Sequence, residues 1–165
     1  SFLSKFGLKK ITEGYNSFSK GSDRKIIELE KKFNNISFLP LICYEIIYTG
    51  KIKRTNQSPD LIINISEDGW FGNSVGPYQH FSHAKFRAIE EGVFVARSTN
   101  NGVSAFIDSN GRVIKSLKNR KSGVLKVKSP IFLKNIFFSK YGNNLFFFFF
   151  FLYILFFLIL KKYEK

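Results

Sequence analysis

Cys43 is the residue with the clearest chemical potential, because it is the only cysteine among 165 residues. Alone, it can form neither an intramolecular disulfide nor a multi-cysteine metal site. It follows the apolar run 38–42, and functional side chains in α/β proteins lie just beyond the carboxyl ends of strands. A thiol at such a turn can act as a nucleophile when the thiolate is stabilised, although lone cysteines more often serve as small buried side chains.

The residues after Cys43 could assist a nucleophile. The backbone N–H of Tyr44 could face an oxyanion, as it does in a strand-to-helix nucleophile turn, and Glu45 could orient a partner by hydrogen bonding. Further along the chain, Arg97 ends an apolar strand and is expected to need a buried acidic partner. The candidates for that partner are Glu45, Glu67 and Asp68.

Two histidines lie three residues apart on a predicted helix, His80 and His83. The spacing suits a metal, but no third ligand is near, so packing or surface roles are favoured and no metal site is predicted. A dyad of Cys43 with either histidine stays open at this point. Trp70 and Phe71 follow an acidic turn and could line a pocket or cover the end of the sheet.

Hydrophobic periodicity predicts an α/β layered fold with a mixed sheet. A hairpin over 27–42 is preferred to a helix over 24–33, and Arg87 and Glu90 should form an ion pair on a helix. The remaining predicted elements are a strand over 61–65, a helix over Tyr78–Glu91 capped by Gly92, and strands over 93–98, 103–107, 112–117 and 123–127.

The net charge of +14 is spread along the whole chain rather than clustered. Nucleic-acid binding is therefore disfavoured, and attraction to anionic lipid headgroups is a better use of this charge. The chain contains no methionine, so we expect it to be a piece of a longer protein.

The C-terminus carries a wholly apolar run over 145–160. As a helix this run spans about 24 Å, and Asn143, Asn144, Lys161 and Lys162 could extend it to cross a bilayer. The terminal lysines favour a cytoplasmic C-terminus. A buried core helix is the alternative. We expect a catalytic part over 1–128, a connector over 129–144, a transmembrane helix over 145–162 and a cytoplasmic tail over 163–165.

Four segments in this order resemble one known family. They are 43–45 (Cys-Tyr-Glu), the Trp-Phe-Gly to Gln-His block over 68–80, the helix segment 85–90 and the run 97–102. Together they resemble the C-terminal half of the apolipoprotein N-acyltransferases, a branch of the nitrilase (carbon-nitrogen hydrolase) superfamily. The resemblance covers about 1–128, and the apolar tail is similar to the family's last membrane helix.

The resemblance implies an α-β-β-α sandwich on the periplasmic side of the bacterial inner membrane, within a multi-pass protein. It implies no cofactor and a two-step reaction, in which a cysteine takes an acyl chain from a phospholipid and passes it to the N-terminal amine of a diacylglyceryl apolipoprotein. Cys43 then matches the nucleophile, Tyr44 the backbone oxyanion donor and Glu45 a supporting carboxylate. Trp70, Phe71 and Tyr78 are candidates for substrate binding.

Two departures from the family pattern matter. The glutamate base and the lysine of the superfamily triad have no match in this sequence, and Lys5 does not take that role, so the 165 residues alone are expected to be inactive. Glu67 replaces an asparagine and could bring negative charge near the thiol. The alternative functions are an amidase that uses the same cysteine, and an inactive, truncated, membrane-anchored remnant.

Overall fold

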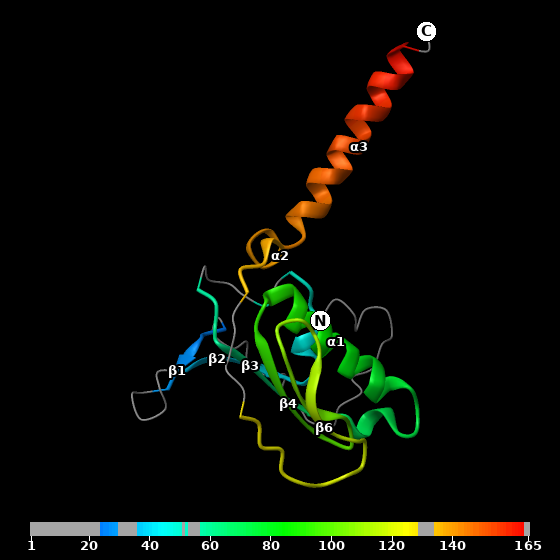
Figure 1. Cartoon of the computed structure of the whole chain (residues 1–165). Helices are drawn as coiled ribbons and strands as arrows, with labels where there is room; N and C mark the ends of the chain where they lie inside the picture. The colour runs from blue at the N-terminus through cyan, green and yellow to red at the C-terminus, as the bar shows by residue number, and fades with distance from the viewer. Residues whose placement is uncertain (1–23, 30–35, 51, 53–56, 129–133, 164–165) are drawn as a thin grey trace, which may run out of the picture.

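The computed structural model describes residues 24–29, 36–50, 52, 57–128 and 134–163. Their fold is a six-stranded mixed sheet with helix α1 packed on one face and helix α3 projecting away from the domain (Figure 1). The elements in order are β1 Ile27–Glu28, β2 Ser37–Ile42, the 3₁₀ helix η3 Cys43–Ile47, β3 Leu61–Glu67, the 3₁₀ helix η4 Gly69–Phe71, α1 Gly76–Glu91, β4 Phe94–Asn100, β5 Ser104–Ile107, β6 Val113–Leu117, α2 Phe137–Tyr141 and α3 Asn144–Tyr163.

The strands lie in the sheet in their sequence order. The central strands β2, β3 and β4 run parallel, β5 and β6 continue as an antiparallel meander, and β1 closes the other edge antiparallel to β2. The predicted mixed sheet is therefore confirmed. The pairing of Ile27 with Phe38 also confirms the hairpin over the helix, although its turn, 30–35, lies outside the described residues.

One face of the sheet changes character along β3. Side chains alternate between the two faces of a strand. On the face toward α1, β3 begins with the buried Ile62, which joins a core that includes Leu41, Val95 and Ala88. Towards its carboxyl end, the same face carries buried polar side chains, starting with Asn64. The strand therefore links the apolar core to a polar site.

Helix α1 begins with Gly76 and Pro77, where a missing N–H costs nothing, and ends at Gly92 in the left-handed conformation, with φ +67°. The predicted helix and its glycine cap are confirmed. Arg87 and Glu90 form the predicted ion pair, with Nη1 2.5 Å from Oε2.

The strand predicted over Gly123–Val127 is wrong, because 121–128 form no strand in the structure. Val124 is 80% exposed, and the segment instead borders a cavity of about 310 Å³ that also contacts Ile63, Ala96 and Phe106, on the sheet face away from α1. Alternation of apolar and polar residues favours a strand but supplies no hydrogen-bonding partner for one.

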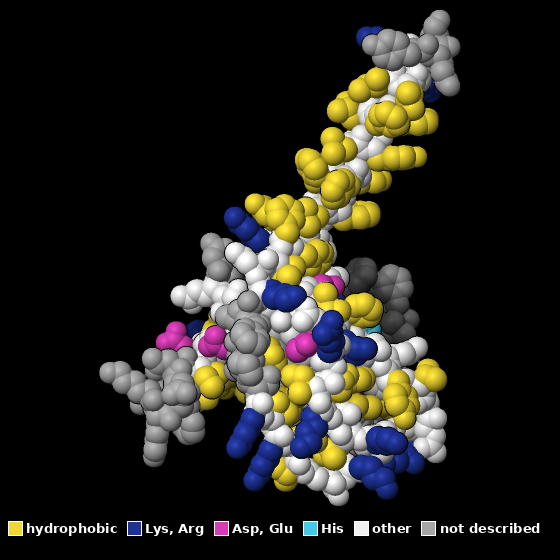
Figure 2. Space-filling model, viewed as in Figure 1, with side chains coloured by type: hydrophobic (Ala, Val, Ile, Leu, Met, Phe, Trp, Pro, Cys, Tyr) yellow, Lys and Arg dark blue, Asp and Glu magenta, His cyan; other side chains and the backbone are white. Residues whose placement is uncertain are grey.

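The apolar C-terminal run forms α3, which Figure 2 shows as a projecting rod covered with hydrophobic side chains. Its segment Asn144–Lys162 is long and apolar enough to cross a membrane, and none of it is buried against the described residues, which favours the transmembrane helix over the core helix. At 1.5 Å per residue the helix is about 30 Å long, close to the thickness of a hydrocarbon core. The short helix α2 lies within the expected connector.

Candidate active site

Cys43 lies at the junction between β2 and η3, as its place after an apolar strand predicted. Its φ is +50°, in the left-handed region, which costs an L-residue about 1–2 kcal/mol. Such backbone strain persists only where the surroundings hold it in place. The thiol is half-buried, and the hydroxyl of Ser66 on β3 lies 3.5 Å from its sulfur.

Asn64 holds the strained turn from beneath. Its side-chain amide donates to the carbonyl of Leu41 at 3.0 Å and to that of Cys43 at 3.3 Å. Arg97 donates to the amide oxygen of Asn64, which fixes the orientation of the amide. This buried asparagine thus braces the backbone on both sides of Ile42, directly at the thiol. Asn64 was not among the predicted site residues, although its place at the polar end of the buried face of β3 could have indicated it.

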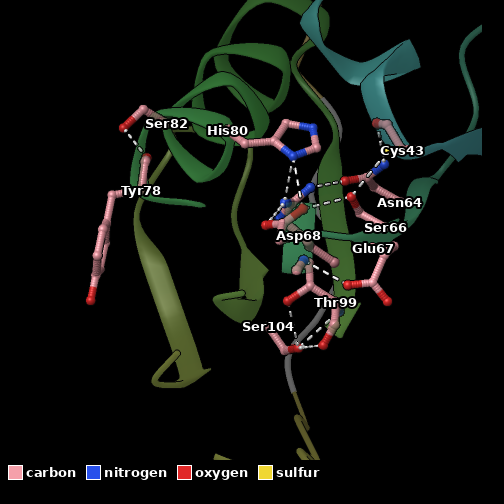
Figure 3. A network of polar contacts seen from close by, with 12 residues as sticks. Cys43, Asn64, Ser66, Glu67, Asp68, Tyr78, His80, Ser82, Thr99 and Ser104 are labelled. Atoms are coloured by element: carbon pink, nitrogen blue, oxygen red, sulfur yellow. Dashed lines mark hydrogen bonds and ion pairs between the residues drawn. The ribbon is translucent and has the colours of Figure 1, made fainter. Parts of the chain in front are cut away.

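A buried carboxylate organises the rest of the site, as Figure 3 shows. Asp68 pairs with Arg97 at 2.7 Å, with Nδ1 of His80 at 2.9 Å and with the hydroxyl of Ser66 at 2.7 Å. Of the three acids considered as partners of Arg97, the structure selects Asp68. Burial alone raises the pKa of Asp68, but hydrogen bonds from His80 and Ser66 and the charge of Arg97 outweigh it and hold that pKa below its usual value.

His80 has a packing and hydrogen-bonding role. Its ring stacks on Tyr44 with centroids 4.8 Å apart and meets Phe71 edge-on at 5.9 Å. The network connects it to the thiol of Cys43 through Asp68 and Ser66, and to the carbonyl of Cys43 through Arg97 and Asn64. The described contacts include no direct pair between the histidine and the thiol. Within the described residues no group of three His, Cys, Asp or Glu side chains could hold a metal ion.

Glu45 braces the turn from its outer side. One oxygen accepts a hydrogen bond from the backbone N–H of Ile42 at 2.7 Å, and the other pairs with Arg24 at 3.2 Å. The ring of Tyr44 is 48% exposed on top of His80. These positions suit the supporting role expected for Glu45 and leave the role of the Tyr44 N–H as a prediction.

Glu67 points to the other face of β3. Its carboxylate accepts from the side chain of Asn100 at 2.5 Å and from the N–H of Gly69 at 2.6 Å. It therefore ties the ends of β3 and β4 together. The carboxylate linked to the thiol through Ser66 is Asp68, and Arg97 lies against that carboxylate.

The three aromatic candidates for substrate binding divide into two groups. Phe71 is packed, with its ring 6.0 Å from that of Tyr44 and against the backbone of Gly76. Trp70 is 84% exposed and Tyr78 is 55% exposed, so neither serves to cover the sheet. Both side chains are therefore accessible to a ligand, although Figure 3 shows Tyr78 pointing away from Cys43.

Comparison with known proteins agrees with this architecture. The family model of carbon-nitrogen hydrolases matches residues 14–130. The solved structure of Nit3 from Saccharomyces cerevisiae, a member of branch 10 of the nitrilase superfamily, superposes with a TM-score of 0.50 at 18% identity, over 61% of this chain and 39% of that one. This similarity concerns the fold alone.

Curated relatives share a name. Apolipoprotein N-acyltransferases of Bradyrhizobium diazoefficiens, Rickettsia bellii and Agrobacterium fabrum are 38%, 40% and 42% identical to this chain over 86%, 81% and 74% of its length. The chain spans about a quarter of each relative, 26%, 26% and 23%. With the family match covering most of the described domain and the mixed α/β sheet of that fold, the chain belongs to the carbon-nitrogen hydrolase family.

Proposed function

We propose that this chain carries the nucleophile of a membrane enzyme that moves an acyl chain from a phospholipid to the N-terminal amine of a diacylglyceryl apolipoprotein. The observation that carries the proposal is the 37–42% identity to relatives named apolipoprotein N-acyltransferase over most of the chain. The position of Cys43 and the apolar helix α3 support it, because an acyl donor held in a bilayer requires both a nucleophile and a membrane attachment.

In the first step, the thiolate of Cys43 attacks the carbonyl carbon of a phospholipid ester. A C–S bond forms, the ester C–O bond breaks, and the lysophospholipid alkoxide leaves with a proton that a general acid supplies. The backbone N–H of Tyr44 stabilises the negative charge on the carbonyl oxygen in the tetrahedral intermediate. Asn64 and Glu45 hold the turn in the shape this requires.

In the second step, the α-amino nitrogen of the apolipoprotein's lipidated cysteine attacks the thioester carbonyl. A C–N bond forms, the C–S bond breaks, and the amine proton leaves while the thiol is restored. Trp70 and Tyr78 are assigned the contacts to the lipid parts of donor and acceptor, since both side chains are exposed. The carbonyl carbon is neither oxidised nor reduced, so the transfer needs no redox cofactor.

The membrane arrangement is part of the proposal. Residues 1–128 belong to the catalytic domain, 129–144 connect it to the bilayer, 145–162 cross the bilayer and 163–165 face the cytoplasm. Lys161 and Lys162 at the end of α3 favour a cytoplasmic C-terminus. The catalytic domain, at the other end of α3, then lies on the periplasmic side of the bacterial inner membrane.

The test is mass spectrometry of the full-length membrane protein incubated with phosphatidylethanolamine, with Cys43→Ser as the control. We expect a hydroxylamine-sensitive acyl adduct on the peptide that contains Cys43, and none on the serine variant after the same treatment. Release of ammonia from small amides without any acyl adduct would instead identify an amidase. No reaction of either kind would support the inactive remnant.

A further inference from the structure

The loop that follows the nucleophile turn touches the root of the membrane helix. Thr49 and Gly50 come directly after η3 and its last flanking residue, Tyr48. The side-chain amide of Asn143, just before α3, donates to the carbonyl of Thr49 at 3.4 Å. We name the contact of Thr49 and Gly50 with Gly142 and Asn143 the elbow contact.

Two glycines let the backbones of the elbow contact meet. A Cβ on Gly50, which has φ +64°, would lie 2.9 Å from Oδ1 and 3.0 Å from the backbone N of Asn143. A Cβ on Gly142, with φ +52°, would lie 3.0 Å from the carbonyl oxygen of Gly50. At both positions only glycine allows the backbone conformation and the close approach together. A glycine on each of the two segments therefore makes the elbow contact possible.

Helix α1 reinforces the elbow contact from a third direction. The hydroxyl of Thr49 lies 2.9 and 3.0 Å from the carboxylate oxygens of Glu90, which also pairs with Arg87. On the other side, the hydroxyl of Ser139 in α2 donates to Glu91 at 3.3 Å. The end of α1 therefore holds both the loop and the helix that leads into α3, so the parts cannot shift independently.

The elbow contact lies where the bilayer surface must be. Helix α3 starts at Asn144, one residue beyond the contact, and is apolar along the length that a hydrocarbon core requires (Figure 2). Lys140 and Tyr141 stand immediately before it, residue types that favour the headgroup region. Along the chain, the described segment from Cys43 to Thr49 contains one element, η3. At about 2 Å per residue, η3 is on the order of 10 Å long.

We propose that the elbow contact fixes the height and orientation of Cys43 above the bilayer, and that attack on a membrane-held ester requires it while attack on a soluble ester does not. The inference rests on the proposed function. Misplacing a reactant by about 1 Å can cost on the order of a hundredfold in rate. A rigid connection of the thiol to α3 therefore matters only when the substrate itself is fixed in the membrane.

The test uses matched neighbours in the full-length membrane protein, reconstituted in phosphatidylethanolamine and phosphatidylglycerol vesicles. Asn143→Ala removes the amide that contacts Thr49 without adding atoms, and Asn144→Ala changes the adjacent residue, which is exposed at the start of α3. Gly50→Ala adds the methyl group that would collide with Asn143. Cys43 is the only cysteine among these 165 residues, so with any cysteine elsewhere in the full-length protein replaced by serine it carries a single fluorophore.

The first measurement is quenching of that fluorophore by lipids with a nitroxide on the headgroup. We expect Asn143→Ala and Gly50→Ala to change the quenched fraction and Asn144→Ala to match the wild type. Identical quenching in all four proteins would overturn the inference. Because this measurement needs no acylation, it decides the elbow contact even if the proposed function fails.

The second measurement compares two acyl donors on the unlabelled protein, vesicle phospholipid and a water-soluble acetyl thioester. We expect Asn143→Ala and Gly50→Ala to slow acylation by vesicle lipid about tenfold to a hundredfold and to leave acylation by the soluble thioester unchanged. An equal loss with both donors would show general damage to the site and contradict the inference. Absence of any lipid adduct on the wild type would count against the proposed function alone.

Discussion

At the scale of single residues, the site depends on one asparagine that donates twice. Asn64 supplies the hydrogen bonds that hold the carbonyls of Leu41 and Cys43, and Arg97 fills its acceptor oxygen. A buried backbone carbonyl that loses its partner costs about 1–3 kcal/mol, and here one of the two carbonyls belongs to Cys43, the residue in the strained conformation. Asn64 therefore supports the shape of the turn as well as the stability of the fold.

We expect Asn64→Asp to lower both stability and thiol reactivity, because it replaces the donating amide by a carboxylate oxygen facing two carbonyl oxygens. The unfolding free energy should fall by about 2 kcal/mol or more, measured by urea unfolding followed by circular dichroism. Alkylation of Cys43 by iodoacetamide should slow at the same time. Asn73→Asp is the control, since Asn73 is exposed and accepts from Arg120, as a carboxylate would.

Asp68 gives the site a dependence on acidity. Its pKa is lowered in the folded protein, so the stability it contributes is complete above the unfolded value of about 3.9 and is lost as the pH falls through the folded value. In Asp68→Asn, Arg97 keeps its buried charge without its carboxylate partner, which costs about 3–5 kcal/mol.

The expected result is that wild type loses stability more steeply than Asp68→Asn between pH 5 and the acid limit of folding, roughly the range over which a depressed carboxyl titrates. Urea midpoints measured across this range test it. Parallel pH profiles for the two proteins would mean that other carboxyl groups carry the acid sensitivity. Asp108→Asn, in a half-buried turn away from the network, provides the comparison.

At the scale of elements, the sequence predicted most of the sheet and one helix, and the reasons are local. The apolar run before Cys43 predicts strand β2, and the glycine after Glu91 predicts the end of α1, from local sequence alone. The strand over Gly123–Val127 was predicted wrongly because strand formation also needs a neighbour with open hydrogen-bonding groups. The choice of Asp68 over Glu45 and Glu67 depended on which face each side chain occupies, which only the assembled sheet decides.

Substitution by alanine should destabilise the protein more at Gly92 than at Gly72, another glycine with positive φ. A Cβ at Gly92 would lie 2.4 Å from the carbonyl oxygen of Lys134 and 2.6 Å from Ile136, whereas at Gly72 nothing lies within 4 Å. Both have positive φ, but Gly92 is left-handed helical with ψ 27°, whereas Gly72 has ψ −134°, where alanine is strained more. Only Gly92→Ala must also displace the connector.

Urea unfolding of the two variants measures this difference. We expect Gly92→Ala to lose more than Gly72→Ala in spite of its milder backbone strain, because forcing extra atoms into a packed contact costs about 1–3 kcal/mol. An equal or smaller loss would indicate that 134–136 give way freely, and the connector would then be a loose tether. The result bears on how firmly the end of α1 holds the chain that leads to α3.

At the scale of the whole molecule, the sequence places charge and apolar surface at separate ends. The folded domain carries scattered lysines and arginines on its surface, and α3 rises from it as an apolar rod (Figure 2). The tail was predicted because sixteen neighbouring apolar residues need no tertiary information, whereas the side on which each end lies depends on the membrane itself.

The last prediction concerns orientation across that membrane. If α3 spans the bilayer with its lysines in the cytoplasm, Cys43 lies outside. A membrane-impermeant maleimide should then label Cys43 in intact spheroplasts, because the thiol is half-buried but not enclosed. In a Cys43→Ser background, a thiol introduced by Lys162→Cys should react only after permeabilisation. The opposite orientation would follow if the introduced thiol were labelled in intact cells and Cys43 of the wild type were not. The acyl-transfer site would then lie on the cytoplasmic side, away from the lipoproteins it is proposed to modify.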